Sequence, residues 1–480
     1  MARTREELRP YQRAGVRFIK ELKRCALFVD PGLGKTSTTL TALGDLIDDL
    51  DCGRVLITAP PQVAKKTWHE EMAQWAHLRG KSYVIIRGTP AARRKLLQRP
   101  ACYHIISMEL LPWLLTELGG KIPIPEKVDD FGEVTQKRDP SWRSPPKCPY
   151  DAIVVDESSK VKESNTNRWR ALKQLAFMVD YFVELTGTPA ANGYENLWAQ
   201  IYLLDGGQRL GGNITAYRDR WFSPKFDGSG YKVKDWAVKI IEERISDIVF
   251  TLRGDDYSTL PPIMNKHVRL ELDEPTMKEY KKFERTYVLK LSEERKLIAR
   301  DGAAITTKLL QLANGIVYDA DKNEHTFHRV KLDALIDLVD EYQGQPLLVA
   351  YAFRSDVARI MKAFPAARLF DDKQETQDAW NRGEIPMLLI HPKAGAHGLN
   401  LQFGGNNVVW YGPTYSLEDH IQLAKRLHRS GQKRPVMVHH FIAEGTIDED
   451  VMAALEGKDD MQEALLNALK KRVELYVQQS

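Results

Sequence analysis

The sequence has 480 residues, of which 43% are hydrophobic and 28% charged, a composition typical of a globular protein of roughly two to four domains. Its 69 Lys and Arg residues against 65 Asp and Glu give a net charge of +4, which permits nucleic-acid binding but does not by itself indicate it. The four isolated cysteines exclude a disulfide framework and a structural zinc site, the N-terminus MARTREELRP lacks the apolar core of a secretory signal, and the apolar runs are too short to span a bilayer.

Short apolar runs in the first part of the chain are typical of buried parallel strands. They lie at 25–30, 54–60, 82–88, 103–108, 151–157 and 181–187. Helical patterns such as QVAKKTWHEEMAQWA separate most of them, and this alternation predicts a doubly wound α/β sheet. We assign residues 1–205 to this first domain, with a Pro- and charge-rich surface loop at 118–149.

Helical periodicity dominates residues 206–325, which predicts a mainly helical protrusion or linker. Its expected helices include 234–253, 275–300 and 303–319, while NKHVRLEL alternates like a strand. A second α/β domain is predicted over 326–456, followed by an amphipathic helix at 457–480. The expected strands of this second α/β domain are 346–352, 386–395, 407–413 and 435–443.

The segment ALFVDPGLGKTS at 26–37 leads from a strand through a glycine-containing turn into a helical pattern, as a phosphate-binding loop does. The full loop pattern would require Gly at the position of Val29. In such a loop Lys35 would reach the β- and γ-phosphates of a nucleotide and Thr36 would hold Mg²⁺. The alternative is an ordinary turn at a helix start with an exposed lysine.

Two acids, Asp156 and Glu157, end the apolar run AIVV. Open α/β sheets bind ligands at the carboxyl ends of their strands. There Asp156 could hold Mg²⁺, directly or through water, and Glu157 could orient or deprotonate an attacking water. A strand ending in solvated acids explains these two residues equally well, and a plain turn explains TGTPAAN at 186–192.

A basic segment, QLAKRLHRSGQ, places Arg426 and Arg429 three residues apart on one predicted helical face. Such a pair could act as arginine fingers on a γ-phosphate, whereas a solvated helix face is the simpler alternative. The neighbouring KAGAHGLNLQ favours the first interpretation, because Gly395 and Gly398 allow close backbone approach to phosphates and Lys393 adds charge.

Taken in order, these segments resemble the motifs of superfamily 2 helicase-like ATPases, specifically their Swi/Snf-type branch. LRPYQ resembles the Gln motif, DPGLGKT the first motif, VVDESSKVK the second, LTGTPAAN the third, KAGAHGLNLQ the fifth and HIQLAKRLHRSGQKRPVMVHHFI the sixth. ITAPPQVAKKTWHEEMAQW and IISMELL match the two motifs that line the nucleic-acid track. The resemblance covers about residues 8 to 450, and RLHRSGQ is its most branch-specific piece.

The resemblance implies two RecA-like parallel-sheet lobes, 1–205 and 326–456, with the helical insert between them and Mg²⁺-ATP hydrolysed between the lobes. The implied ATP-binding residues are Gln12, Gly32, Leu33, Gly34, Lys35, Thr36 and Ser37, with Thr36 and Asp156 for the metal. The implied catalytic residues are Glu157, Asp156, Lys35, Arg426 and Arg429. The implied nucleic-acid contacts are Lys65, Ser107, Lys393 and Asn400.

The function implied is an ATP-dependent, sequence-independent translocase on duplex DNA that remodels protein–DNA complexes or branched DNA. The alternatives are a strand-separating DNA or RNA helicase and, outside enzymes, a nucleotide-gated DNA clamp, which the presence of Glu157 and the arginine pair disfavours. The chain resembles a motor without accessory modules, and other protein partners are open. It is expected in the cytoplasm of a bacterium or of a virus-infected cell, or in the nucleus of a eukaryote.

Two departures from the family pattern matter. Ser158 and Ser159 follow the acid pair where the family often has Ala-His, so hydrolysis should persist while its coupling to DNA differs. Pro31 replaces the usual Met beside the phosphate loop and is expected to stiffen it. The aromatic and basic segment 217–239 is either a DNA-contacting protrusion or, as we favour, a core segment in which Trp221, Phe222 and Phe226 are buried.

Overall fold

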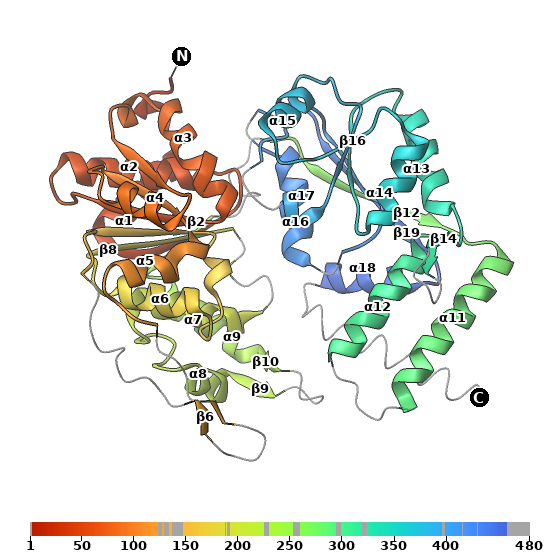
Figure 1. Ribbon diagram of the computed structural model, residues 1–480, viewed down its shortest axis with the longest axis horizontal. Coiled ribbons are helices and arrows are strands. Elements are labelled where there is room, and N and C mark those ends of the chain that lie inside the picture. Colours follow the sequence, from red (N-terminus) through yellow and green to blue (C-terminus); the bar gives the residue numbers. More distant parts are fainter. Residues whose placement is uncertain are drawn as a thin grey trace. The chain divides into compact units, whose positions relative to one another are not determined.

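The computed structural model divides the chain into two compact units, Met1–Ser258 and Thr259–Ser480, each built around its own parallel sheet (Figure 1). The predicted α/β fold class with two parallel-sheet lobes is thereby confirmed. The structure describes residues 2–122, 127–128, 134–136, 147–187, 189, 193–224, 230–252, 260–293, 299–318, 324–395, 399–414, 416–429 and 431–457. Among these residues, no helix combines the length and apolar character that a membrane span needs.

The first unit contains a seven-stranded sheet in the order β11-β1-β8-β7-β2-β4-β3, with every neighbouring pair parallel. All strands predicted in this part of the sequence are present. The strands are β1 Arg24–Val29, β2 Val55–Ala59, β3 Tyr83–Ile86, β4 Tyr103–Ser107, β7 Ala152–Asp156, β8 Tyr181–Thr186 and β11 Val249–Leu252.

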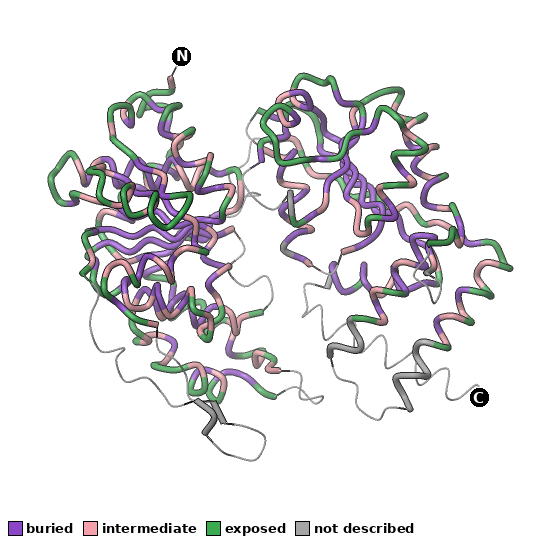
Figure 2. Tube along the Cα trace, in the orientation of Figure 1, coloured by how far each residue is buried: buried purple, intermediate pink, exposed green. Residues whose placement is uncertain are grey.

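Helices cover both faces of this sheet, so its central strands are buried on both sides, which is why they appear in the sequence as continuous apolar runs (Figure 2). Alternate residues of β7 point into different cores: Val154 joins the core with α1, α2 and α3, and Val155 joins the core with α5 to α9. The helices are α1 Pro10–Leu22, α2 Lys35–Asp48, α3 Trp68–Gln74, α4 Pro90–Leu97, α5 Leu111–Glu117, α6 Asn167–Ala176, α7 Leu197–Asp205, α8 Ile214–Trp221 and α9 Asp235–Ile245.

The second unit contains a six-stranded parallel sheet in the order β12-β19-β18-β15-β17-β16. Its strands are β12 Ile263–Leu270, β15 Leu347–Ala350, β16 Arg368–Leu369, β17 Met387–Ile390, β18 Asn407–Trp410 and β19 Val436–Ala443. Its helices are α11 Glu274–Glu293, α12 Ala299–Ala313, α13 Val330–Glu341, α14 Arg354–Ala363, α15 Gln374–Asn381, α16 Pro392–Gly395, α17 Leu417–Leu427 and α18 Ile447–Gly457.

Among the described residues, three antiparallel strand pairs lie outside the two sheets. They are β5 Lys127–Val128 with β6 Val134–Gln136, β9 Phe222–Pro224 with β10 Tyr231–Val233, and β13 Ile316–Tyr318 with β14 Glu324–Thr326. The first pair falls within the predicted surface loop 118–149, much of which lies outside the described residues.

The structure divides the segment 206–325, which the sequence predicted as one mainly helical insert. Helices α8 and α9 pack into a core of the first unit, and β11 pairs with β1, whereas β12 pairs with β19 in the second unit. The predicted helix 234–253 ends at Ile245, because the following β-branched and aromatic residues pair as a strand. The predicted helix 457–480 lies outside the described residues.

A second predicted helix in this region, 303–319, also ends early. Helix α12 stops at Ala313, and Gly315 adopts a φ of 92°, a left-handed conformation that suits glycine and ends a helix. The chain then forms β13, so only the first part of that predicted helix is correct.

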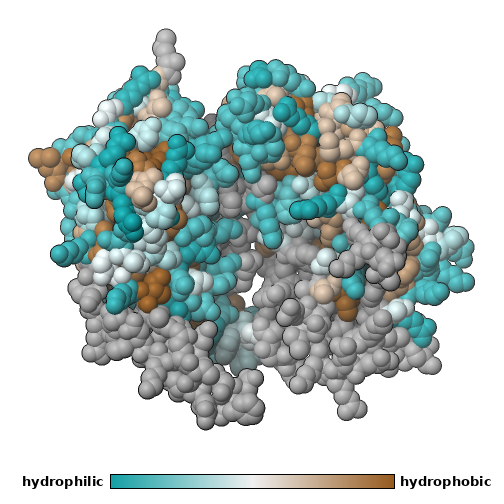
Figure 3. Space-filling model, viewed as in Figure 1, coloured by the Kyte–Doolittle hydropathy of each residue, from teal (hydrophilic) through white to brown (hydrophobic). Residues whose placement is uncertain are grey.

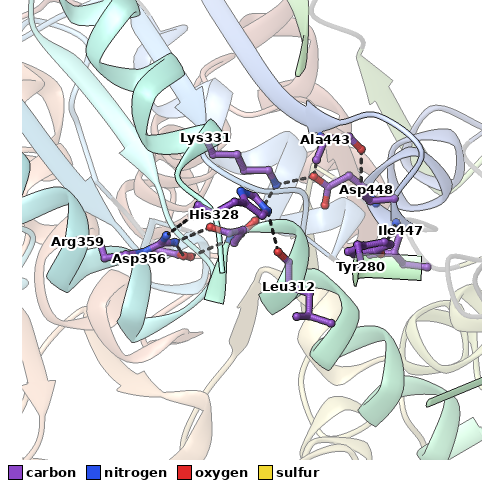
Figure 4. A network of polar contacts seen from close by, with 11 residues as sticks. Tyr280, Leu312, His328, Lys331, Asp356, Arg359, Ala443, Ile447 and Asp448 are labelled. Atoms are coloured by element: carbon purple, nitrogen blue, oxygen red, sulfur yellow. Dashed lines mark hydrogen bonds and ion pairs between the residues drawn. The ribbon is translucent and has the colours of Figure 1, made fainter. Parts of the chain in front are cut away.

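A buried polar network ties the helices of the second unit together (Figure 4). Lys331 Nζ lies 2.5 Å from Asp448 Oδ2 and donates to Asn314 Oδ1 at 2.7 Å, and both charged side chains are fully buried. Asn314 Nδ2 in turn donates to Asp356 Oδ2 at 3.0 Å. Because each buried charge has a partner, the network fixes α12, α13, α14 and α18 in one arrangement.

Candidate nucleotide-binding and catalytic site

The phosphate loop connects β1, which ends at Val29, to α2, which begins at Lys35. Gly32 and Gly34 have φ values of 89° and 80°, in the left-handed region that favours glycine. The ammonium of Lys35 donates to the carbonyl oxygen of Val29 at 2.6 Å. Val29 itself is a buried strand residue, so the absence of glycine at this position leaves the turn intact.

Gln12 from α1 lies directly against the loop. Its Nε2 donates to Ser37 Oγ at 3.1 Å, and its Oε1 accepts from the backbone N–H of Arg9 at 2.9 Å. A Cβ added to Gly34 would collide with the Gln12 amide, so this close approach requires glycine. The structure therefore brings Gln12 together with Gly34 and Ser37, as a nucleotide site would require.

The remaining loop residues divide into exposed and buried positions. Gly32 is exposed and Thr36 is half-buried at the start of α2, where free backbone N–H groups favour anions. The side chains of Leu33 and Ser37 are buried. Leu33 packs in the core beside α2, so only its backbone is available to a ligand.

The carboxylate of Asp156, at the end of β7, is buried and has two hydrogen-bond donors. Trp68 Nε1 donates to Oδ2 at 3.0 Å, and the backbone N–H of Glu157 donates to Oδ1 at 3.1 Å. Burial raises the pKa of Asp156 above its usual range, the charge of Glu157 adds to the rise, and Lys35 opposes it. The acid pair and Lys35 of the phosphate loop are thus close enough to interact electrostatically.

Trp68 belongs to the site although the sequence did not reveal it. It lies in an apolar helical pattern, and nothing in that pattern distinguishes it from an ordinary core tryptophan.

Glu157 adopts a left-handed conformation, φ 54° and ψ 56°, which is strained for a residue with a side chain. A short 3-10 helix, Ser158–Val161, follows it directly. The carboxylate oxygen Oε2 of Glu157 is buried and has no hydrogen-bond partner among the described residues. A buried carboxylate oxygen of this kind is suited to a bound water.

The donor atoms around the loop also suit Mg²⁺, which prefers oxygen ligands. The hydroxyl of Thr36 and the carboxylate of Asp156 supply such oxygens, and a cation would favour the ionised form of Asp156. The residues present therefore fit the metal predicted for this site.

Two predicted nucleic-acid contacts lie on the same edge of the sheet as the phosphate loop. Lys65 is exposed on a π-helical turn, Val63–Thr67, that follows β2, and Ser107 ends β4. Ala59 of β2 is the register partner of Ser107, so these two segments leave the sheet at the same level. π-Helical turns such as Val63–Thr67 often occur at functional sites.

In the second unit, Arg426 is buried on α17, which ends at Leu427. The prediction that Arg426 and Arg429 share a helical face is wrong, because His428 leaves the helical conformation with ψ 72°. Arg429 instead lies in the following turn, where its Nη1 donates to Asn400 Oδ1 at 2.7 Å. Lys393 is exposed on α16, directly after β17.

Gln432 holds this turn in place, a role the sequence analysis missed. Its Nε2 donates to the carbonyl oxygens of Gln402 and Gly405, both at 3.0 Å. Its Oε1 accepts from the backbone N–H groups of Lys433 and Arg434. The buried amide thereby joins the segment after Asn400 to the turn that carries Arg429.

The described residues of the third motif are Leu185, Thr186, Gly187 and Pro189. A Cβ added to Gly187 would lie 2.6 Å from Cδ of Pro31, so the ring of Pro31 packs directly on this glycine. Pro31 therefore joins the phosphate loop to the end of β8.

The aromatic and basic segment is a core segment where it is described. Trp221 and Phe222 are 2% and 4% exposed, as favoured above, while Phe226 lies outside the described residues.

Two parallel α/β sheets, a phosphate loop and an adjacent acid pair define a helicase-like ATPase. Residues 11–316 match the SNF2-related domain, and residues 330–431 match the helicase conserved C-terminal domain. The chain therefore belongs to the Swi/Snf-type branch of the superfamily 2 helicase-like ATPases, which confirms the predicted family and ATPase activity.

Known proteins are similar over most of the chain. Protein p41 of Acyrthosiphon pisum secondary endosymbiont phage 1 is 33% identical, covering 97% of this chain and 99% of that protein. The ATP-dependent helicase MG018 of Mycoplasma genitalium and the DNA repair and recombination protein RAD54 of Oryza sativa subsp. japonica are each 23% identical over 95% of this chain. The chain spans only 42% and 51% of these two relatives.

Among solved structures, the Sulfolobus solfataricus SWI2/SNF2 ATPase core in complex with dsDNA is 20% identical with a TM-score of 0.45. The match covers 98% of this chain and 96% of that one. This likeness is too distant to bear on ligands.

Proposed function

We propose that this ATPase is a translocase on duplex DNA, which couples hydrolysis of Mg²⁺-ATP to movement along DNA and to remodelling of protein–DNA complexes or branched DNA. One observation carries the proposal. The phosphate loop, the acid pair, Lys65 and Ser107 all follow the carboxyl ends of strands in a single parallel sheet. A nucleotide and a nucleic acid bound there would share one rigid edge, so a change at one would reach the other.

The charge of the neighbouring segment supports a polyanionic partner. Residues 72–108 contain seven Lys and Arg residues and no Asp or Glu, although the whole chain is nearly balanced. This segment forms β3, α4 and β4, and Arg87 is exposed just after β3, which pairs with the strand that ends at Ser107. Phosphate-backbone contacts of this kind give affinity without sequence preference.

The surface agrees with a partner bound through polar contacts. Among the residues coloured by hydropathy in Figure 3, hydrophilic ones are the most common on the face shown. Arg93 of α4 lies 4.5 Å from the ring centroid of Trp113, which orders its guanidinium at this surface.

The proposed mechanism uses the residues at the loop. The ATP phosphates would lie on the backbone N–H groups of the loop, and Lys35 would exchange the carbonyl of Val29 for a phosphate oxygen. Mg²⁺, held by Thr36 and Asp156, would neutralise phosphate charge. Glu157 would accept the proton of the attacking water through its unpartnered Oε2.

The arginines of the second unit complete the proposal. Arg426 and Arg429 would contact the γ-phosphate, where arginine fingers raise turnover by roughly 10³- to 10⁵-fold. The names of two relatives support DNA as the partner: the DNA repair and recombination protein RAD54 and the human Chromodomain-helicase-DNA-binding protein 1, which is 22% identical over 94% of this chain.

The test compares ATPase stimulation by duplex DNA, single-stranded DNA and RNA, together with displacement of a third strand from a DNA triplex. We expect the strongest stimulation by duplex DNA and release of the third strand while the duplex stays paired. Release of a strand from a forked duplex would instead identify a helicase. Stimulation by RNA alone would overturn the proposal.

A further inference from the structure

We infer that Gln200 is a positioning residue for Glu157 and acts through the hydroxyl of Ser158. The inference rests on the proposed catalytic role of Glu157. It concerns Ser158, one of the two serines that follow the acid pair where the family often has Ala-His. It does not depend on which nucleic acid the protein binds.

The starting point is the left-handed backbone of Glu157. A non-glycine residue in this region is strained, and the conformation persists only where neighbouring contacts hold it. Ser158 follows immediately and is fully buried. Its Oγ donates to Oε1 of Gln200 at 2.8 Å.

The amide of Gln200 makes two further hydrogen bonds from the middle of α7. Its Nε2 donates to the carbonyl oxygen of Pro189 at 3.0 Å and to that of Asn196 at 3.1 Å. Gln200 is fully buried, so the side chain uses its acceptor and its donors entirely inside the protein. It thereby fastens the residue after Glu157 to the segment that follows β8.

The surroundings of this link are unusually polar for a core. Glu184 on β8 is fully buried and is the register partner of Val155, which precedes the acid pair. Burial raises the pKa of Glu184 well above its usual range, while Ser158 and Arg24 oppose the rise. Both carboxylate oxygens of Glu184 are buried without a hydrogen-bond partner among the described residues. Such a buried polar group is costly, which favours a functional role for this part of the core.

The amide is required because no similar side chain makes all of these bonds. Glutamate at position 200 could accept from Ser158 but could not donate to Pro189 and Asn196, and leucine could do neither. Loss of the link would remove the acceptor that Gln200 offers to the Ser158 hydroxyl and allow Glu157 to relax. The phosphate loop comes from other elements, so ATP binding should change little while the chemical step slows.

The experiment compares Gln200→Leu, Gln200→Glu, Ser158→Ala and the double variant Ser158→Ala with Gln200→Leu. Each is measured in the full chain, with a saturating concentration of the nucleic acid that most stimulates the unchanged protein. The readouts are kcat and KM for ATP, the affinity for a fluorescent ATP analogue, and thermal unfolding. Gln174→Leu is the matched control, because Gln174 also donates from Nε2 to a carbonyl, that of Lys121, but on the surface.

We expect kcat to fall by about 10- to 100-fold in each single variant while KM changes by less than about threefold. The double variant should be no slower than the slower single variant, because both changes break one link. The control should keep its kcat.

A kcat within about twofold of the unchanged protein in folded Gln200→Leu, or effects that multiply in the double variant, would overturn the inference. Should Gln200→Leu not fold, Ser158→Ala removes a single oxygen and carries the same test. Turnover retained in Glu157→Gln would refute the catalytic role itself. An inactive Glu157→Gln beside a fully active Gln200→Leu would refute only the positioning role.

Discussion

Arg429 donates a hydrogen bond from Nη1 to Oδ1 of Asn400 at 2.7 Å within the second unit. The two residues were assigned to different ligands, Arg429 to the γ-phosphate of ATP and Asn400 to nucleic acid. Their contact means that a ligand that engages Asn400 also acts on the orientation of the arginine. If both proposed roles hold, binding of nucleic acid at Asn400 should change the position of Arg429, which the first prediction tests.

Asn400→Ala should lower kcat for DNA-stimulated ATP hydrolysis even when DNA is saturating, because Arg429 loses a fixed partner. Lys393→Ala is the comparison: it removes an exposed charge and should raise the DNA concentration that gives half-maximal stimulation, with kcat kept. ATPase titrations with duplex DNA distinguish the two. A pure loss of DNA affinity in Asn400→Ala would contradict the linkage.

Lys35→Ala and Glu157→Gln should both abolish ATP hydrolysis for different reasons. Lys35→Ala removes the phosphate-binding charge and should weaken nucleotide binding. Glu157→Gln should keep binding, because the amide has the size of the carboxylate but does not accept the proton. Binding of a fluorescent ATP analogue beside phosphate release separates the cases, and turnover in either variant would refute the site assignment.

Trp68→Phe should raise the Mg²⁺ concentration that gives half-maximal ATP hydrolysis. The substitution removes the N–H that orients the Asp156 carboxylate, and such outer contacts typically contribute about 10- to 100-fold to metal affinity. The matched control is Trp75→Phe, since Trp75 Nε1 donates to Glu71 Oε1 at 2.8 Å instead. Equal Mg²⁺ dependence of ATP hydrolysis in the two variants would rule out this role of Trp68.

Gly187→Ala should weaken ATP binding, since the new methyl group would press on the ring of Pro31 and shift the phosphate loop. Pro31→Ala removes the opposing ring atoms and should restore binding in the double variant. Isothermal titration with an ATP analogue measures both effects. If Pro31→Ala gave no rescue, the contact would not explain the loss.

The stability of the second unit should depend on pH through Asp356, at the centre of the network in Figure 4. Burial raises the pKa of this carboxyl from 3.8 to about 6, although Phe353 N–H, Arg359 and Asn314 oppose the rise. The folded state therefore keeps a proton that the unfolded chain releases. The free energy of unfolding should fall as pH rises from about 4 to 6, by on the order of 3 kcal/mol.

Asp356→Asn removes this titration and should flatten the pH dependence over that range. Denaturant unfolding of both proteins, followed by a probe in the second unit, checks the sign. The same slope in the variant and the unchanged protein would show that another group is responsible.

Much of the fold was accessible from the sequence because parallel strands buried on both faces form continuous apolar runs. The strand β11 was missed because its residues continue the periodicity of α9 and because an edge strand is defined by its pairing with β1. The helix end at Leu427 was missed for a similar reason, since the basic residues beyond it keep a helical spacing.

The site was predicted unevenly. Glycine, lysine and acid positions follow from local chemistry, and the structure brings Lys35, Asp156 and Glu157 together as expected. Trp68, Gln200 and Gln432 were not found, because each acts through a hydrogen bond to a residue distant in sequence. An indole or amide in a helical pattern does not indicate which group it will face.

The π-helical turn at Val63–Thr67 has a geometric consequence for Lys65. A π-turn accommodates one residue more than an α-helical turn, and each residue of an α-helix turns the chain by about 100°. Deleting one residue here would restore regular α-helical winding. The side chains before the deletion would then point to another side of the helix axis. In homologous chains, an insertion or deletion at this turn would change which side chains lie beside Lys65 on the helix surface, while the strands on either side would be unaffected.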